Sequence, residues 1–289
     1  ARLPPVTDDP AFAGIRTAAV AGLGLIGGSV ARDLAARGVR VLGHDRDPSA
    51  VAAAIREGVV SAALGDGFEG VEEADVLLLA VPVLAAREVL RIAGPRLDRV
   101  RLVTDAGSTK RSIVALAEEM GIGARFVGAH PMAGDHRSGW DASRAGLFAG
   151  ARVFLCPADG AGEDALALAE ALWTGLGGKT ETVDAAEHDR LLAWTSHLPQ
   201  AVSTALAAAL AERGIGRGEL GPGGRDVTRL AGSSPGMWID ILRDNAPAVS
   251  DALAAMEMEI HEMREAVASE DPDRIRERFA RGKRWGDDG

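Results

Sequence analysis

The residues best suited to acid–base chemistry in this chain are His130 and Ser108, each placed where an apolar segment ends. His130 follows the apolar run 125–129 and precedes a proline, which predicts an imidazole held at the end of a strand. Because histidine takes up a proton near neutral pH, His130 is a candidate base for an alcohol whose carbon loses a hydride; the alternative is a structural histidine. Ser108 is a candidate partner for the same hydroxyl, or else the N-cap of the helix that follows.

A second polar group interrupts the long helical pattern at 187–213. Ser196 and Gln200 lie four residues apart and therefore share one helix face, with His197 between them. Proline in a helix interior costs about 3 kcal/mol, so Pro199 predicts a bend that re-aims these side chains. This segment is therefore a candidate for ligand contact.

Two arginines and a tryptophan follow a glycine-rich segment further along the chain. Arg229 can bind a carboxylate bidentately, and Arg225 and Trp238 flank it. The alternative for both arginines is an ion pair with Asp226 or Asp240. For four of the remaining histidines the sequence favours ordinary surface positions: His44, His136, His188 and His261.

A glycine-rich turn links two apolar strands and the helical segment between them. Gly22, Gly24 and Gly27 have the GxGxxG spacing of a dinucleotide-binding βαβ unit. Gly22 permits a tight turn, Gly24 leaves no Cβ between the backbone and a pyrophosphate, and Gly27 lets helix and strand pack closely. The helix N-terminus then offers N–H groups to the phosphates.

Asp45 ends the second apolar strand, about 20 residues after the turn, where a carboxylate accepts hydrogen bonds from the adenosine ribose. A carboxylate repels a 2′-phosphate, so Asp45 predicts NAD, although Arg46 beside it leaves NADP open. Ligands of such sheets bind beyond the carboxyl ends of the strands. The other residues that we expect to contact the cofactor are Leu25, Ile26, Val81, Pro82, Asp105 and Ser108.

The overall composition excludes several classes of protein. A net charge of −10 argues against a nucleic-acid or anionic-membrane surface and leaves a small molecule as the expected partner. The single cysteine, Cys156, excludes an internal disulfide and a multi-cysteine metal site, and we expect no metal. No apolar run reaches the ~18 residues that span a bilayer, and no signal peptide is evident. We expect a soluble, cytoplasmic protein.

Apolar strands alternate with helical segments over the first two thirds of the chain. This alternation predicts an α/β fold, a doubly wound parallel sheet of the Rossmann type that binds a dinucleotide. The predicted strands are 17–21, 39–43, 75–81, 101–104, 125–129, 152–156 and 179–183.

From Asp184 onward only helical patterns follow. We therefore expect a loose leader at 1–16, a dinucleotide-binding domain at 17–184 and an all-α substrate and dimerisation domain at 185–289. The alanine-rich helices of the last part exceed what a small monomeric bundle needs, so we expect a homodimer through this domain. The chain ends soon after these helices, so we expect no C-terminal regulatory domain.

Taken in order, six motifs resemble those of the prephenate/arogenate dehydrogenase family. They are GLGLIGGS at 22–29, DAGSTK at 105–110, HPMAG at 130–134, HD at 188–189, SHLP at 196–199 and RDVTRLAGSSPGMWIDILRDN at 225–245. The resemblance spans roughly residues 17–250. It implies a nucleotide-binding domain followed by a helical dimerisation domain.

The resemblance implies a reaction, the oxidative decarboxylation of prephenate to 4-hydroxyphenylpyruvate with NAD(P), a step of tyrosine biosynthesis. By resemblance, His130 hydrogen-bonds the ring hydroxyl, Ser108 supports the same hydroxyl and Arg229 binds a substrate carboxylate. The other substrate-binding residues implied are Ser196, His197, Gln200, Arg225 and Trp238.

Gln200 departs from the family pattern SHLPH, in which this position is histidine. A neutral amide favours prephenate, because the ammonium of arogenate or of an amino-substituted analogue needs a carboxylate partner. Remoter alternatives are a β-hydroxyacid dehydrogenase or imine reductase and a non-catalytic NAD-binding sensor. The dehydrogenase would carry a catalytic lysine that the helix at 187–213 lacks, and His130 with Arg229 argues against the sensor.

Overall fold

The computed structural model describes residue 12 and residues 14–135 and 137–287 of the chain. Most of the predicted leader at 1–16 lies outside the described residues. Phe12 and Ile15, which are described, are buried in a hydrophobic core.

The chain packs into two compact units, and the first of them is discontinuous in sequence. The first unit comprises residues Ala1–Leu192 and Gly232–Asn245, and the second comprises Ala193–Ala231 and Ala246–Gly289. The predicted division after residue 184 stays a prediction.

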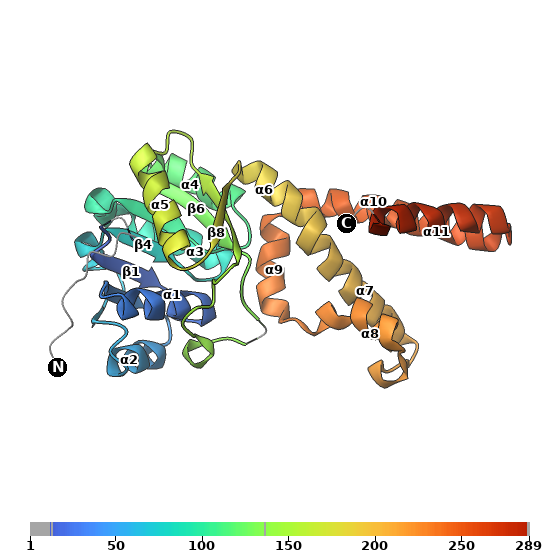
Figure 1. Cartoon of the computed structure of the whole chain (residues 1–289), viewed down its shortest axis with the longest axis horizontal. Helices are drawn as coiled ribbons and strands as arrows, with labels where there is room; N and C mark the ends of the chain where they lie inside the picture. Colours follow the sequence, from blue (N-terminus) through green and yellow to red (C-terminus); the bar gives the residue numbers. More distant parts are fainter. Residues whose placement is uncertain (1–11, 13, 136, 288–289) are drawn as a thin grey trace. The chain divides into compact units, whose positions relative to one another are not determined.

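One eight-stranded sheet forms the centre of the first unit (Figure 1). Its order is β3-β2-β1-β4-β5-β6-β7-β8, so the chain crosses over from one side of β1 to the other, as in a doubly wound sheet. The pairs are parallel except β6–β7, which is antiparallel. The predicted α/β fold is confirmed. The strands are β1 (Thr17–Ala21), β2 (Arg40–His44), β3 (Ala62–Ala63), β4 (Val76–Leu79), β5 (Leu102–Asp105), β6 (Phe126–Pro131), β7 (Arg152–Pro157) and β8 (Lys179–Thr182).

Helices cover both faces of this sheet and bury two separate cores. On one face lie α1 (Leu25–Ala36), α2 (Pro48–Arg56) and α5 (Glu163–Gly175). On the other lie α3 (Val83–Ala93), α4 (Arg111–Glu119) and α6 (Ala185–Leu192). Successive residues of a strand point to opposite faces, so in β1 Ala18 and Val20 join the first core while Ala19 and Ala21 join the second.

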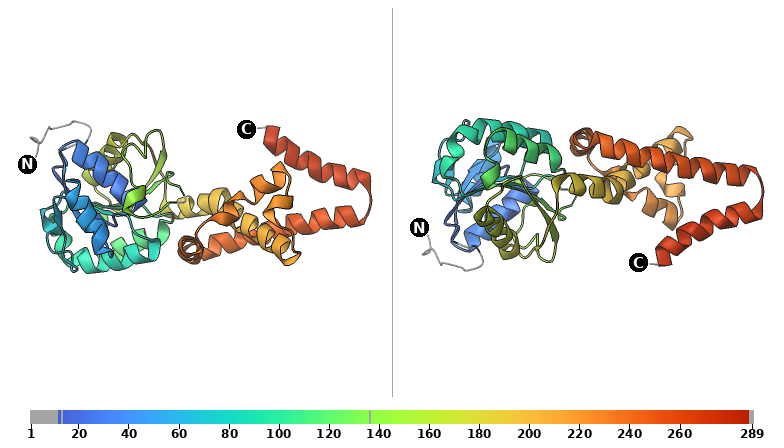
Figure 2. Two further views of the ribbon diagram at one scale, coloured as in Figure 1. Left: turned by 90° about the horizontal axis from the view of Figure 1, so that it is seen from below. Right: turned by 90° about the horizontal axis from the view of Figure 1, so that it is seen from above.

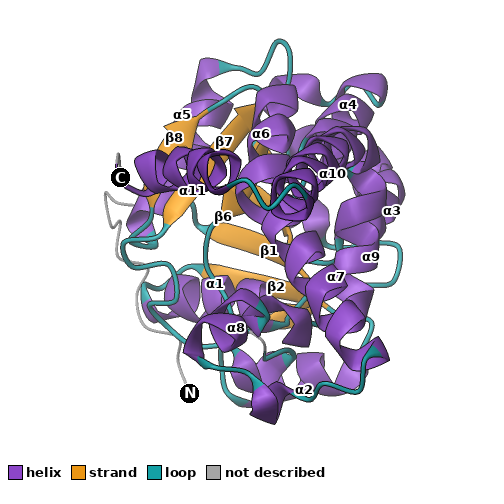
Figure 3. Cartoon of the chain, turned by 90° about the vertical axis from the view of Figure 1, so that its right-hand side faces the viewer, coloured by secondary structure: helices purple, strands orange, loops and turns teal. Residues whose placement is uncertain are grey.

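The second unit contains helices alone among its described residues, as Figure 3 shows by colour. A π-helical turn, Ala193–His197, precedes Pro199, so the predicted interruption of the helix lies just before the proline. The two longest C-terminal helices form a hairpin joined by ion pairs from Arg278 to Glu259 and Glu262 (Figure 2). The helices of this unit are α7 (Leu198–Glu212), α8 (Pro222–Val227), α10 (Ala246–Ala268) and α11 (Pro272–Asp287).

The segment between Gly232 and Asn245 returns to the first unit and contains α9 (Pro235–Asp244). Its C-terminal carboxylate, Asp244, accepts hydrogen bonds from Thr109 Oγ1 at 2.6 Å and Ser112 Oγ at 2.8 Å. The last helical residue of the segment therefore ties it to the start of α4. None of the described helices is both long and apolar enough to cross a membrane.

Candidate active site

The glycine turn after β1 has the backbone geometry that a bound pyrophosphate requires. Gly22 has φ +94°, a conformation that side chains disfavour, and a Cβ there would lie 2.4 Å from the Ala80 carbonyl oxygen. A Cβ at Gly27 would lie 1.9 Å from the Gly22 oxygen. At Gly24 a Cβ would meet only the Gly139 nitrogen, 4.0 Å away, so this glycine leaves open space rather than avoiding a clash.

The first helix starts directly behind that turn. Its N-cap is Gly24, and no side chain caps its first N–H groups. Helix N-termini carry donors and a partial positive charge, so the turn and α1 together suit a phosphate. The residues present fit a dinucleotide.

A cleft of about 820 Å³ extends from the turn across the carboxyl ends of β1, β2 and β4. Asp45 lies in it, and its carboxylate accepts hydrogen bonds from Leu23 N at 2.7 Å and Asp47 N at 2.9 Å. These two bonds fix the carboxylate between the glycine turn and the start of α2. Of the predicted cofactor residues, the cleft is lined by Gly22, Gly24, Asp45, Arg46, Val81 and Pro82.

The other predicted cofactor residues lie outside that lining. Leu25 and Ile26 form the first turn of α1, within van der Waals reach of a Cβ built on Gly134. Asp105, at the end of β5, is buried and accepts hydrogen bonds from Gly107 N at 2.8 Å and Ala129 N at 3.1 Å. Their contact with the cofactor stays a prediction, as does that of Gly27 and Ser108.

His130 lies near the end of β6 and belongs to a buried relay of three residues, His130, His188 and Asp189. Its Nδ1 lies 2.9 Å from His188 Nε2, and His188 Nδ1 lies 2.8 Å from Asp189 Oδ1. The Phe154 ring packs edge-on against His188, with centroids 5.2 Å apart. The predicted strand-end position of His130 is confirmed.

Asp189 sits on the N-terminus of α4, and the hydrogen bonds that it accepts there indicate the tautomers of the two histidines. Its two oxygens accept hydrogen bonds from Lys110 N at 2.8 Å and Arg111 N at 2.9 Å. Backbone N–H groups at a helix N-terminus only donate, so both Asp189 oxygens act as acceptors. An ionised Asp189 only accepts, so His188 donates from Nδ1 and accepts at Nε2 from His130 Nδ1. The lone pair of a neutral His130 is therefore on Nε2.

The loop between β5 and α4 is braced by a buried ion pair. Lys110 is fully buried, and its ammonium pairs with the Asp105 carboxylate. Lys110 is also the N-cap of α4, so Ser108 is not the N-cap that one interpretation expected. Ser108 lies half-buried in this loop, three residues after Asp105.

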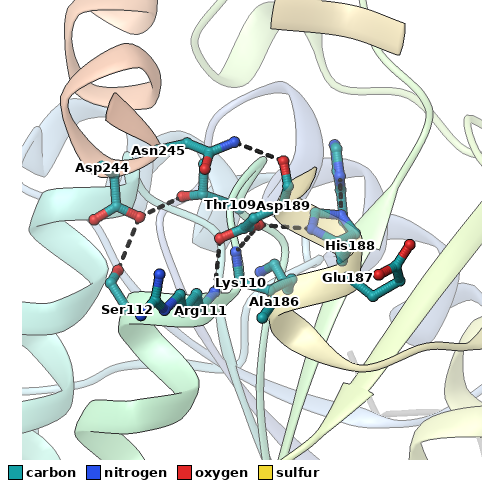
Figure 4. A network of polar contacts seen from close by, with 12 residues as sticks. Thr109, Lys110, Arg111, Ser112, Ala186, Glu187, His188, Asp189, Asp244 and Asn245 are labelled. Atoms are coloured by element: carbon teal, nitrogen blue, oxygen red, sulfur yellow. Dashed lines mark hydrogen bonds and ion pairs between the residues drawn. The ribbon is translucent and has the colours of Figure 1, made fainter. Parts of the chain in front are cut away.

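The start of α4, the end of α9 and α6 meet in one hydrogen-bonded network (Figure 4). Asn245 donates its side-chain amide to the Asp189 carbonyl oxygen at 2.7 Å, beside the Asp244 contacts to Thr109 and Ser112. Asp189 is thus held by its carboxylate, its backbone and its neighbour His188. The relay has little freedom to move.

The predicted substrate residues lie mostly in the second unit. Arg229 and Arg225 are exposed there, Ser196 is half-buried and His197 is buried. Gln200 is buried and donates its amide to the Leu230 carbonyl oxygen at 2.8 Å. Trp238 alone belongs to the first unit, in α9. Their roles toward a substrate stay predictions.

His188 is the functional residue that sequence reasoning misplaced. A surface position was the favoured interpretation, and it is wrong, because the His188 side chain is fully buried. The signal that could have found it is the motif His188-Asp189, which is one of the six motifs that resemble the family. Of the other three, His44 lines the cleft, His261 is exposed and His136 lies outside the described residues.

Metal ligands do not gather at this site. Among the described residues, no group of three or more histidine, cysteine, aspartate or glutamate side chains could hold an ion. Burial raises the pKa of the Cys156 thiol to about 12, so it stays protonated.

Two family models match the chain, one over each part. Residues 30–182 match the prephenate dehydrogenase nucleotide-binding domain, and residues 184–281 match the prephenate dehydrogenase dimerization domain. The prephenate dehydrogenase of Bacillus subtilis is 34% identical, covering 94% of this chain and 75% of its own length. The cyclohexadienyl dehydrogenase of Zymomonas mobilis is also 34% identical, covering 90% and 92%.

Solved structures of similar proteins share the fold over nearly the whole chain. Prephenate dehydrogenase from Aquifex aeolicus, in complex with hydroxyphenyl propionate and NAD+, has a TM-score of 0.85 at 30% identity and covers 93% of this chain and 96% of its own. Synechocystis arogenate dehydrogenase has a TM-score of 0.79 at 27% identity, covering 94% and 99%.

Proposed function

The chain belongs to the prephenate dehydrogenase family of NAD-dependent oxidoreductases, and we propose that it oxidises and decarboxylates prephenate to 4-hydroxyphenylpyruvate. The observation that carries the proposal is the relay of His130, His188 and Asp189 at the end of β6. The glycine turn and Asp45 stand at the ends of β1 and β2 in the same sheet. This places a proton acceptor and a dinucleotide cradle on one carboxyl edge.

The cofactor would be held chiefly by backbone groups. The turn at Gly22 and Gly24 and the start of α1 suit the pyrophosphate, while Asp45 suits the ribose hydroxyls. When bound, NAD supplies the acceptor for the substrate hydride. A 2′-phosphate would approach the Asp45 carboxylate, which accounts for NAD as the cofactor.

His130 takes the proton of the ring hydroxyl at Nε2. As the proton arrives, His130 becomes an imidazolium that still donates Nδ1–H to His188, and His188 donates to the ionised Asp189. The carboxylate stabilises the developing positive charge without taking a proton. Because the relay is buried, these interactions are stronger than they would be in water.

Loss of the ring carboxylate completes the reaction. Loss of the hydride and of the hydroxyl proton leaves the ring carbon bearing oxygen as a carbonyl. When CO2 departs, the electron pair of the broken C–C bond passes through the ring to that oxygen, and the resulting phenolate takes back a proton from His130. The aromatic ring that forms makes the overall reaction strongly downhill. Arg229 is proposed to bind a substrate carboxylate, because a guanidinium matches it bidentately. Ser108 is proposed to hold the same hydroxyl as His130.

Steady-state kinetics with both substrates and both nicotinamide cofactors tests this function. We expect a higher kcat/KM for prephenate than for arogenate, since the neutral Gln200 offers no negative charge to an ammonium. A strong preference for arogenate would contradict the substrate, and absence of turnover with either would contradict the activity. The predicted cytoplasmic location stays a prediction.

We further propose a dimer formed through the second unit. Large apolar side chains on α10 and α11 are exposed, among them Ile260 and Val267, which also line a groove of about 440 Å³. Exposed apolar surface of this kind marks a protein interface. Light scattering coupled to size exclusion should give twice the chain mass, and a charged substitution, Val267→Glu, should shift it toward the monomer.

A further inference from the structure

Residues 138–141, in the loop between β6 and β7, form a wall of the cofactor cleft that the glycine motif does not contain. Ser138, Gly139, Trp140 and Asp141 all line the cleft. The Gly139 nitrogen lies 4.0 Å from the position that a Cβ would occupy on Gly24. This segment therefore runs over the turn that suits the pyrophosphate.

Trp140 is the anchor of this wall. It is 5% exposed, and its indole nitrogen donates to Glu57 Oε1 at 2.9 Å. The Arg32 guanidinium lies over the ring, 4.1 Å from its centroid, and pairs with Glu57 at 2.8 Å. A cation over an indole face is the strongest of the cation–aromatic contacts. The indole hydrogen bond and Arg32 both lower the pKa of Glu57, so it is ionised at neutral pH.

Ser143 completes the arrangement, which we call the Trp140 clasp (Arg32, Glu57, Trp140 and Ser143). Its hydroxyl accepts from Arg32 Nε at 2.8 Å and donates to the Trp140 carbonyl oxygen at 2.6 Å. The clasp joins three segments of the chain near the cleft. Arg32 comes from α1, Glu57 is the C-cap of α2, and Trp140 and Ser143 come from the loop between β6 and β7. Gly28 makes room for it, since a Cβ there would lie 2.7 Å from Ser143 Cβ.

We propose that the Trp140 clasp holds residues 138–141 against the glycine turn and thereby sets the affinity for NAD. Trp140 is then a positioning residue that acts on the cofactor through the loop backbone. A loop that is already ordered loses less conformational entropy when the cofactor binds. The inference rests on NAD as the cofactor and is independent of which cyclohexadiene is oxidised.

The test is calorimetric titration of NAD into the full chain, together with steady-state kinetics. For Trp140→Ala we expect the Kd for NAD to rise about tenfold, the effect of losing one hydrogen bond and one cation–aromatic contact. At saturating NAD, kcat and the KM for prephenate should stay within about twofold of wild type. NAD titration needs no turnover, so failure of the proposed substrate would leave this result readable.

If Trp140→Ala does not fold, two conservative variants measure how strongly NAD binding depends on the clasp. Trp140→Phe keeps an aromatic ring under Arg32 but has no N–H, and Glu57→Gln keeps the acceptor but loses the charge, so each should weaken NAD binding by a smaller factor. The control is Trp173→Phe, at a fully buried position of α5, which should lower Tm and leave NAD binding unchanged. Unchanged NAD affinity in folded Trp140 and Glu57 variants, or a loss confined to kcat, would overturn the proposal.

Discussion

Around the carboxyl ends of β1 and β2, the site consists of backbone groups and of room left by missing side chains, whereas around β5 and β6 it consists of buried charged and polar side chains. At the first place Gly24 leaves space and α1 presents N–H groups. At the second, Asp189 is satisfied by two backbone donors and His188. The cofactor brings its own negative charge, so its site needs backbone donors that remain available to it. His130, as a proton acceptor, instead needs a negative charge that the protein supplies and holds in a fixed position.

The sharpest test of this contrast is Asp189→Asn. An asparagine oxygen in the place of Oδ1 can still accept from Lys110 N and His188 Nδ1, but its amide group then faces the Arg111 N–H, and the negative charge that stabilises the His130 imidazolium is lost. We expect kcat to fall about 100-fold or more, as for His130→Ala, because a positioned base contributes that much.

The same variant should leave NAD binding unchanged, since the relay lies outside the cleft lining. Calorimetry for NAD and kcat measured from pH 6 to pH 9 separate these effects. A kcat within threefold of wild type would mean that Asp189 does not act through His130.

In the glycine turn, the variants Gly24→Ala and Gly27→Ala should have different kinds of effect, one on NAD binding and the other on stability. The alanine methyl at position 24 meets no protein atom closer than 4.0 Å, so this variant should fold and lose NAD affinity by roughly tenfold, or about 1.4 kcal/mol. At position 27 the methyl would lie 1.9 Å from an oxygen, so that variant should unfold at a lower temperature. Thermal melts and NAD titration distinguish them; equal behaviour of the two would contradict the separate roles.

A smaller effect is expected from Asp45→Ser. Removing the carboxylate lifts the repulsion of a 2′-phosphate while Arg46 remains to pair with it, so the ratio of kcat/KM for NAD to that for NADP should fall several-fold. Asp47→Ser is the matched control, because Asp47 lines the same cleft but caps α2 through Ser49 N. If both variants shift the ratio equally, Asp45 does not face the ribose.

The glycine turn can be predicted from the sequence more easily than the relay, for a physical reason. The glycine turn, its strand and Asp45 lie within about 30 consecutive residues, and local backbone rules connect them. The relay joins His130 to a histidine 58 residues later, and its Asp189 is held by Asn245, which lies 56 residues after Asp189. No periodicity of the chain encodes such a meeting, so His188 looked like a surface residue and Lys110 gave no sign of its burial.

The fold itself was largely predictable, with three exceptions that have identifiable causes. Seven strands were located from the sequence, most of them because buried strands are continuous apolar runs; β8, with the sequence KTET, is largely exposed. The two-residue β3 is too short to show a pattern, and the helix at 222–227 lies in a glycine-rich segment that predicts a loop. The antiparallel direction of β7 could not be predicted, because the hydrophobicity of a strand does not depend on the direction in which the strand runs.

The smallest predicted effect concerns Cys156. Burial raises its pKa from 9.0 to about 12, so the folded state favours the protonated thiol. The stability that this contributes is complete below pH 9 and is lost as the pH rises toward 12. Iodoacetamide at pH 8 should therefore modify the native chain far more slowly than the urea-unfolded chain, as mass spectrometry can measure. Equal rates would show that the thiol is accessible.

The return of residues 232–245 to the first unit has a consequence for synthesis on the ribosome. The partners of Thr109, Ser112 and the Asp189 carbonyl are Asp244 and Asn245, so this corner of the nucleotide-binding unit stays incomplete until the chain has passed residue 245. Domains generally fold as units in order of emergence. Here the N-terminal unit must wait for most of the polypeptide, so a nascent chain stalled after residue 192 should be sensitive to protease at the start of α4.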